Sequence, residues 1–176
     1  MTSKKFLNSL ANGKSDVVQL FLDQLEKLKI DYCVIGGLAV NAYAEPVASL
    51  DLDLVLAVKD IVKLLEKIGL PKGKFSVTKF SHSINLEHPD SDLRILIQTD
   101  PKYQSFITKA SMKKVLGYEM KVAALEDLLK GKIWAYSDDE RRKSKRQKDL
   151  ADIMRLVETH QHLFDLLPEN IKALIK

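Results

Sequence analysis

The chain has 176 residues, of which 45% are apolar and 30% are charged, and its formal net charge is +4. These proportions exclude a disordered chain and indicate one domain with a well-solvated surface and a short helical appendage. The mild positive charge favours anionic partners such as nucleotides or RNA, but it does not identify a nucleic-acid binder.

Cys33 is the only cysteine, so neither an intrachain disulfide nor a cysteine-based zinc site can form. This composition suits a reducing compartment. Met1–Leu7 are not followed by the long apolar core of a signal peptide, and no apolar run approaches the ~18 residues that span a membrane. We therefore expect a cytoplasmic protein with no membrane partner.

The first part of the chain alternates between helical and extended patterns. Apolar residues recur at helical spacing after Ser15, a suitable N-cap, and strands are marked by buried or alternating runs. In chain order, these patterns predict a helix over about 16–29, a strand at 31–35, a helix at 38–45, a strand at 50–58, a helix at 60–68, and short strands over about 75–80, 83–87 and 92–98.

From about residue 101 the pattern becomes mainly helical. Helices are predicted over about 102–109, 125–136 and 145–160, and a last short helix begins at Pro168. This order of elements predicts an α/β (α+β) fold, with a mixed β-sheet flanked by helices and a helical C-terminal part. We expect a single domain over residues 1–176, with a core over about 16–120 and C-terminal helices over about 121–176.

The strand at 50–58 places Asp51 and Asp53 on one face, because side chains in a strand repeat every two residues. Two unpaired carboxylates repel each other, and a divalent cation such as Mg²⁺, which prefers oxygen ligands, removes that cost. A bound Mg²⁺ would attract nucleotide phosphates. For the spacing alone, an edge strand with two solvated acids is the more frequent explanation.

Gly36 and Gly37 stand where a predicted strand ends and a helix begins. Glycine lets the backbone approach a phosphate closely, and the start of a helix offers unpaired N–H groups. A plain tight turn would also need glycine. A glycine pair followed about 14 residues later by an acid-x-acid strand is nevertheless a much stronger signal than either motif alone.

Four stretches resemble, in order and spacing, the nucleotidyltransferase superfamily of the DNA polymerase beta type: Gly36–Tyr43, Ser49–Leu54, Lys132–Ala135 and Arg146–Ile153. The resemblance covers roughly residues 30–158 and looks closest to the branch related to the AbiEii toxins. It implies a mixed sheet in which the glycine turn faces the metal-binding strand. It also implies transfer of a nucleoside monophosphate from an NTP to an acceptor hydroxyl.

The same resemblance implies roles for individual residues. Asp51 and Asp53 would hold Mg²⁺, which bridges the phosphates. Substrate contacts are assigned to Gly36, Gly37, Ser49, Arg94, Lys132, Lys148 and Asp149. The acceptor stays open between a small molecule such as an aminoglycoside-like antibiotic, a protein hydroxyl and an RNA such as a tRNA end, and the toxin relatives suggest an antitoxin as partner.

Two positions depart from the pattern of the relatives. Many relatives have an arginine four residues before the first aspartate, where this chain has Val47. Many also have a third metal-binding acid on a later strand, and its expected place here is Leu96. Asp92 lies on the same face of that strand and is the best substitute as a catalytic acid, ahead of Asp100 and Glu87. These departures leave open a catalytically degenerate module that only binds a nucleotide or a partner.

The most basic segment of the chain is residues 141–148. Such a run is as often a solvated helix start as a site for a polyanion, either the phosphates of an NTP or an RNA acceptor, so a pure RNA-binding module is a further alternative. Asp149 and Asp152 follow Lys145 and Lys148 at helical spacing, and ordinary ion pairs within one helix would explain this arrangement.

Overall fold

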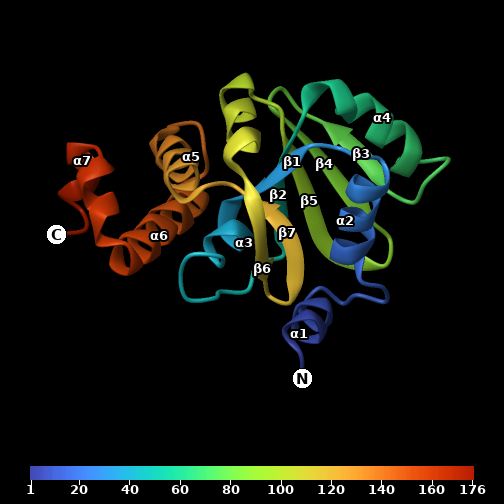
Figure 1. Ribbon diagram of the computed structural model, residues 1–176, viewed down its shortest axis with the longest axis horizontal. Coiled ribbons are helices and arrows are strands. Elements are labelled where there is room, and N and C mark those ends of the chain that lie inside the picture. The colour runs from blue at the N-terminus through green and yellow to red at the C-terminus, as the bar shows by residue number, and fades with distance from the viewer.

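The computed structural model describes residues 1–176, and its centre is a seven-stranded mixed sheet flanked by helices (Figure 1). The order of the strands across the sheet is β3-β4-β5-β2-β1-β7-β6. β2 runs parallel to β5 and β1 runs parallel to β7, whereas the other neighbours are antiparallel. The strands are β1 (Tyr32–Ile35), β2 (Asp51–Leu56), β3 (Ser76–Lys79), β4 (Ser83–His88), β5 (Ser91–Gln98), β6 (Ser111–Val115) and β7 (Tyr118–Val122). The predicted mixed α/β fold is confirmed.

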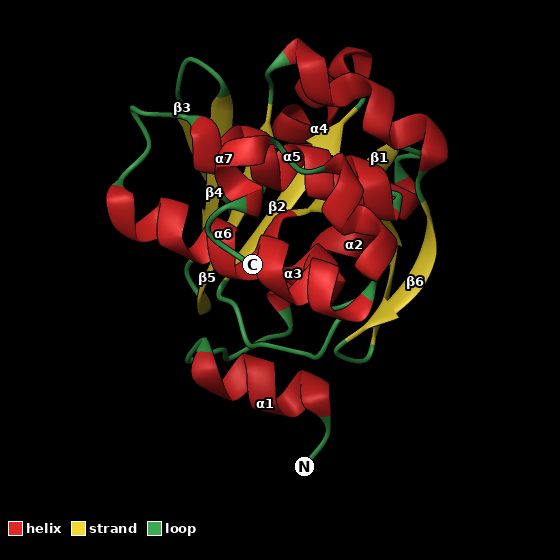
Figure 2. Cartoon of the chain, turned by 90° about the vertical axis from the view of Figure 1, so that its left-hand side faces the viewer, coloured by secondary structure: helices red, strands yellow, loops and turns green.

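The helices lie on both sides of this sheet. In Figure 1, α2 and α4 lie to the right of the strands and α5, α6 and α7 to the left, and Figure 2 shows the second group in front of the sheet. The α-helices are α1 (Ser3–Leu10), α2 (Val17–Lys27), α3 (Gly36–Val40), α4 (Val58–Ile68), α5 (Leu125–Ser137), α6 (Lys143–Thr159) and α7 (Glu169–Lys172), and the 3-10 helices are η1 (Pro101–Lys109) and η2 (Gln161–Leu166). None of them combines the length and the apolar character needed to cross a bilayer.

The hairpin of β6 and β7 corrects the prediction of a mainly helical region after residue 101. Four of the five residues of β6 are exposed, so the strand lacks the alternation that marks a half-buried strand. The turn is also unusual, because Leu116 and Gly117 both have positive φ, at 49° and 87°. Two-residue hairpin turns with positive φ at both positions normally use Asn or Asp before the glycine.

Three smaller corrections concern helices. Asp16, not Ser15, is the N-cap of α2, and its carboxylate accepts a hydrogen bond from the Gln19 backbone N–H at 3.1 Å. The helix predicted over 38–45 is shorter, because α3 ends at Val40 and continues as turns. The segment predicted as helix 102–109 is the 3-10 helix η1.

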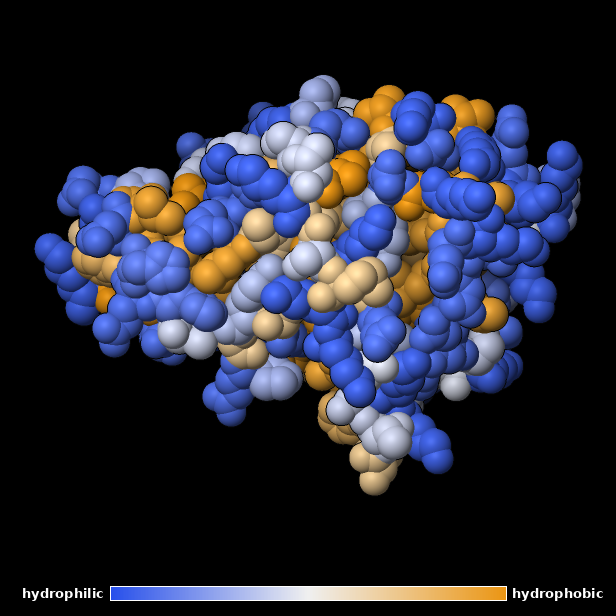
Figure 3. All heavy atoms as spheres, in the orientation of Figure 1, coloured by the Kyte–Doolittle hydropathy of each residue, from blue (hydrophilic) through white to orange (hydrophobic).

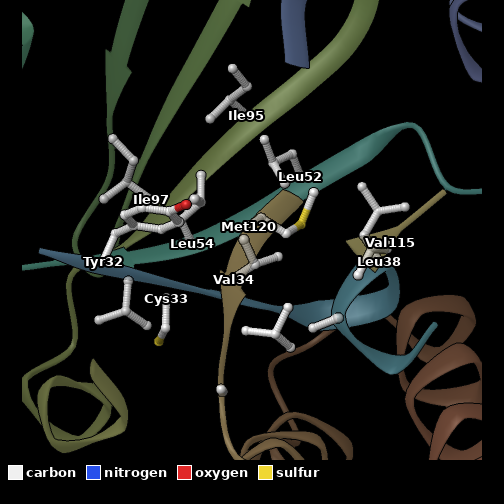
Figure 4. Close-up of a cluster of buried hydrophobic side chains, with 14 of the residues drawn as sticks. Tyr32, Cys33, Val34, Leu38, Leu52, Leu54, Ile95, Ile97, Val115 and Met120 are labelled. Atoms are coloured by element: carbon white, nitrogen blue, oxygen red, sulfur yellow. The ribbon is translucent and has the colours of Figure 1, made fainter. Parts of the chain in front are cut away.

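One part of the core lies on the side of β2 and β5 that faces away from the acids. Leu52 and Leu54 of β2 and Ile95 and Ile97 of β5 are fully buried, and Figure 4 shows them gathered in one cluster. Each such side chain contributes about 1.5–3 kcal/mol by leaving water. Since side chains alternate across a strand, this burial fixes Asp51, Asp53 and the even-numbered residues of β5 on the opposite face.

The C-terminal helices share this core. A single hydrophobic cluster of 40 buried residues extends from the strands to Leu163, Leu167 and Ile171 beyond α6. On the surface, hydrophilic side chains cover most of the face shown in Figure 3, with apolar atoms visible between them. The C-terminal helices are therefore packed on the sheet through apolar side chains.

Candidate active site

The glycine turn is shaped by the carboxylate of Asp53. β1 runs antiparallel to β2 with Ile35 opposite Asp53, and the chain leaves β1 at Gly36, whose φ is +74°. A Cβ atom at Gly36 would lie 2.1 Å from Oδ2 of Asp53, so no other residue fits there. At Gly37, by contrast, the nearest atoms to an added Cβ are 3.8 Å and more away. Gly36 is thus required for Asp53 to pack against the turn.

The register of β2 and β5 decides which side chains stand beside the two acids. Asp51 is opposite Arg94, and Asp53 is opposite Leu96. The residue at the place expected for a third acid is therefore an aliphatic neighbour of Asp53. Gln98 follows on the same face of β5 and lines the same pocket.

Asp51 is held by two cations from different parts of the chain. Nη2 and Nε of Arg94 lie 2.8 Å and 2.9 Å from Oδ1 of Asp51. Nζ of Lys145, in the first turns of α6, lies 3.2 Å from Oδ2. The Asp51 carboxylate therefore has one cation on each oxygen.

Asp53 has no such partner. Its carboxylate makes neither a hydrogen bond nor an ion pair, and it is partly buried. Burial raises the pKa of Asp53 to about 6, although the cation of Lys132 opposes the shift; the neighbouring Asp51 adds to it. The carboxylate is therefore an anion in an unfavourable environment, which an added cation would stabilise.

Behind Asp53, Lys132 of α5 is buried between two carboxylates of α6. Its Nζ lies 3.1 Å from Asp149 and 2.7 Å from Asp152. Burial alone would lower the pKa of Lys132, but the two carboxylates outweigh burial and raise that pKa. Arg141 pairs with Asp149 at 2.7 Å and Arg155 with Asp152 at 2.8 Å, so the charges alternate along the network.

The pairing of α6 corrects the interpretation of Asp149 and Asp152 as partners of lysines on their own helix. Both acids pair with Lys132 of α5, and neither pairs with Lys145 or Lys148. Lys145 contacts Asp51 instead, whereas Lys148 is exposed and makes no ion pair. Of the substrate-contact residues expected on α6, the structure brings Asp149 to the site and leaves Lys148 on the outer surface.

A pocket of about 210 Å³ opens beside Asp53, between the sheet, η1 and α5. Tyr103 and Phe106 of η1 form an aromatic wall, with Trp134 packed against both at centroid distances of 5.2 Å and 5.7 Å. The polar and charged residues that line the pocket are Asp53, Ser83, Gln98, Tyr103, Lys132, Arg141 and Asp149. The pocket thus combines an apolar wall with cations on one side.

The proposed substitutes for the third acid lie elsewhere. Asp92 is exposed, lies two residues before the position opposite Asp51, and accepts a hydrogen bond from Asn12 at 2.6 Å. Asp100 caps η1 through the Lys102 backbone N–H, and Glu87 is exposed on β4. No three acidic, histidine or cysteine side chains come close enough together to hold a metal ion.

The donor set at Asp51 and Asp53 fits one hard divalent cation. Both carboxylates lie on one face of β2, and the oxygens of Asp53 are free of hydrogen bonds. Mg²⁺ typically binds one or two carboxylates and completes its shell with water and phosphate oxygens. Ser49 lies next to this pair, because its hydroxyl accepts a hydrogen bond from the Asp51 N–H at 3.3 Å and is close to Gly37.

Several residues at the site were not predicted as such, among them Lys145, Arg141, Tyr103 and Phe106. For Lys145 the sequence contained a signal. Residues i, i+4 and i+7 of a helix share one face, and Lys145, Asp149 and Asp152 have this spacing. Arg141 belongs to the basic segment 141–148, for which a polyanion site was one interpretation, whereas the two aromatic residues reach the pocket through tertiary packing, for which the local sequence offers no signal.

Comparison with known proteins gives similarity only at the level of structure. No protein-family model and no curated protein sequence matches the chain. The solution structure of the antibiotic-resistance factor ANT(2'')-Ia is similar, with a TM-score of 0.57 and 11% identity over 90% of this chain and 86% of that one. The lincomycin-bound lincosamide antibiotic adenylyltransferase LnuA has a TM-score of 0.52 and 14% identity over 82% of this chain and 98% of that one.

A third similar structure is an antigenic nucleotidyltransferase-like protein from Paracoccidioides brasiliensis, with a TM-score of 0.50 and 20% identity over 89% of this chain and 78% of that one. At these identities the likeness describes the fold. The chain therefore has a nucleotidyltransferase-like fold, in agreement with the expectation from its motifs.

Proposed function

We propose that this protein is a divalent-metal-dependent nucleotidyltransferase that transfers a nucleoside monophosphate from an NTP to an acceptor hydroxyl. The observation that carries the proposal is Asp53, a partly buried carboxylate without a partner, beside Asp51 and packed on Gly36. The fold shared with nucleotidyltransferases supports it.

The roles follow from the position of each group. Asp51 and Asp53 would hold Mg²⁺, which would supply positive charge to the phosphates. Gly36, Gly37 and Ser49 lie beside the two acids, so that the backbone can approach the triphosphate. We assign no role to Asp92, because it is bound to Asn12 outside the pocket.

Lys132 and Arg141 provide the positive side of the pocket. Lys132 stays protonated between its two carboxylates. It also lies close enough to Asp53 to oppose the rise in the pKa of that acid. Arg141 is fixed by Asp149, which leaves part of its guanidinium exposed at the pocket. A guanidinium held in this way is suited to binding phosphate oxygens. We therefore assign both residues to substrate binding, with Asp149 positioning them.

For the acceptor we propose a small hydroxyl compound as the first class to test. One similar structure is ANT(2'')-Ia in complex with adenylyl-2''-tobramycin, and another is LnuA with lincomycin bound. The resemblance to the AbiEii-related branch supports an RNA end or a protein hydroxyl as the alternative acceptor, with an antitoxin as partner.

The proposal is tested by incubating the purified protein with Mg²⁺, an α-labelled NTP and, in separate reactions, aminoglycosides, lincosamides, bulk tRNA and no added acceptor. Label should move to one of these acceptors or to the protein itself, and D51A/D53A should abolish the transfer. D92N is the matched control and should keep the wild-type rate, since Asp92 lies outside the pocket. Transfer that survives in D51A/D53A would exclude the mechanism.

A catalytically degenerate nucleotide-binding module is the second candidate. The observation that favours it is Leu96 opposite Asp53, together with Val47, which is 52% exposed at the place of the missing arginine. This candidate predicts that the protein binds an NTP with Mg²⁺ but does not turn it over. Turnover that depends on Asp51 and Asp53 in the labelling assay would reject it.

The third candidate, RNA binding through residues 141–148, is weakened by the ion pairs of that segment. Arg141, Lys145 and Arg146 each pair with an aspartate of the same chain. The exposed cations that remain are Arg142, Lys143 and Lys148. Charge reversal of these three residues should weaken tRNA binding if the candidate is correct, and unchanged affinity would remove it.

A further inference from the structure

The charges around the site are distributed unevenly between the two metal-binding acids. Asp149 and Asp152 are neutralised by Lys132, Arg141 and Arg155 behind the pocket. Of the two metal-binding acids, Asp51 pairs with two cations, whereas Asp53 pairs with none. Arg94 and Lys145 together therefore carry one positive charge more than is required to neutralise the Asp51 carboxylate.

The same region cannot supply the ligands of a second metal ion. Leu96 occupies the position opposite Asp53, and Asp92, the nearest acid along β5, is bound to Asn12. In two-metal sites, a pair of ions stabilises both the attacking and the leaving oxygen. With only Asp51 and Asp53 available, this site has carboxylates for one ion, and further positive charge has to come from side chains.

Arg94 and Lys145 are in the right place to supply that charge. Their side chains are 49% and 27% exposed, so burial does not fix them in place. A divalent ion bound to Asp51 would coordinate the carboxylate oxygens. Arg94 and Lys145 would then lose their ion pairs with Asp51 and lie beside the ion. The phosphates that bind to the ion are then the nearest anions to both side chains.

We propose that Arg94 and Lys145 bind the triphosphate in place of a second metal ion, so that the site operates with a single divalent ion. The inference rests on the proposed function and adds to it Lys145, the exchange of partners by Arg94 and Lys145, and the number of ions. In the free protein these cations neutralise Asp51; in the complex they neutralise phosphate oxygens.

This exchange of partners has a consequence that a merely structural role would not produce. Removing the two charges frees Asp51 from competing cations, so a metal ion alone should bind more tightly. The same change removes two charged contacts to the phosphates, so the nucleotide should bind more weakly. The two affinities should therefore change in opposite directions.

The experiment uses the full chain, Mn²⁺ as the metal probe and a nonhydrolysable ATP or GTP analogue as the nucleotide. Free Mn²⁺ is measured by electron paramagnetic resonance, first without and then with a saturating analogue, and the affinity for the analogue is measured by calorimetry. The variants are R94Q, K145Q and R94Q/K145Q. K148Q is the matched control, because Lys148 lies on the same helix as Lys145 but is exposed and without an ion pair.

We expect one Mn²⁺ per chain in the wild-type complex with the analogue. R94Q/K145Q should bind Mn²⁺ alone about twofold to fivefold more tightly, the range expected for an exposed ion pair. It should bind the analogue about tenfold more weakly, as expected for lost charged hydrogen bonds. K148Q should leave both affinities unchanged.

Four outcomes would overturn the inference. Two Mn²⁺ ions in the wild-type complex would show that a second ion finds ligands after all. Wild-type affinity of R94Q/K145Q for the analogue, or a loss of affinity for both probes, would show that the cations are not exchanged between Asp51 and phosphate. Wild-type protein that binds neither analogue would remove the proposed function as well, so the two failures are distinguishable.

Discussion

Among the single residues, Asp53 links the chemistry of the site to stability. Its pKa is raised from 3.8 to about 6 by burial, so the folded protein binds a proton at Asp53 more tightly than the unfolded chain does. The stabilisation by this proton is fully present below pH 4 and is lost as the pH rises through about 6. Above that pH the ionised Asp53 carboxylate lowers the free energy of unfolding by up to about 3 kcal/mol, unless a cation binds.

We therefore expect D53N to be more stable than the wild type at pH 8 in the absence of metal, and about equally stable at pH 4. Thermal unfolding at the two pH values measures this difference. Mg²⁺ should raise the Tm of the wild type at pH 8 and have little effect on D53N. A D53N protein that is less stable than the wild type at pH 8 would contradict the assignment of Asp53 as an unfavourably buried anion.

Gly36 and Gly37 form a matched pair for a second prediction. G36A places a Cβ atom 2.1 Å from the Asp53 carboxylate and forces a non-glycine residue to a φ of +74°. We expect a loss of about 1–3 kcal/mol in the free energy of unfolding and the loss of metal binding. G37A adds a Cβ atom whose nearest neighbours are at ordinary contact distance, so it should be tolerated. Urea unfolding and Mn²⁺ titration of both variants provide the comparison.

At the residue scale, the sequence predicted which site residues share one face of a strand. Period-two alternation placed Asp51 and Asp53 on one face, and the alignment of motifs placed Leu96 where an acid was expected. The structure has both features. The partners of these acids could not be predicted, because Arg94 and Lys145 are brought to Asp51 by strand pairing and helix docking. Such contacts depend on the register and on the rotation of a helix about its axis.

At the scale of elements, the Lys132 network joins α5 to α6. K132M would leave Asp149 and Asp152 without their shared cation, and Asp149 is only 2% exposed. We expect a loss of about 1–3 kcal/mol in the free energy of unfolding, since Asp149 and Asp152 keep Arg141 and Arg155 but lose their charged hydrogen bonds to Lys132. K130M is the control, because Lys130 lies on the same helix but is exposed and without an ion pair. Similar urea midpoints for K132M and K130M would show that the network contributes nothing to the docking of the helices.

The elements themselves were predictable where their hydrophobic pattern was regular. β2, β4 and β5 alternate between buried and more exposed residues over most of their length, and all three were expected close to their observed bounds. The β6–β7 hairpin was missed although β7 alternates between buried and more exposed residues, because β6 is an exposed edge strand and the turn is Leu116-Gly117. Its strand character comes from pairing with β7, and β7 in turn pairs with β1, a long-range contact.

For the whole molecule, the question is whether the sheet and the C-terminal helices form one unit. The 40 residues of the core form one cluster that includes Leu156 of α6 and Ile171 of α7 together with the central strands. The charged network adds a second connection, because Lys132, Asp149 and Asp152 contact the region of Asp53 and Gly37. Both connections predict that neither part remains folded when the other unfolds.

The chain contains one natural probe in each part. Trp134, the only tryptophan, lies on α5, and Cys33, the only cysteine, is fully buried in β1. Burial raises the pKa of the Cys33 thiol to about 12, so this thiol should react with a disulfide reagent only when β1 opens. In urea, the fluorescence of Trp134 and the reactivity of Cys33 should therefore report one transition with the same midpoint. A fluorescence transition that precedes exposure of Cys33 would show that the C-terminal helices unfold as a separate unit, and the site would then lose Lys132 and Lys145 before the sheet unfolds.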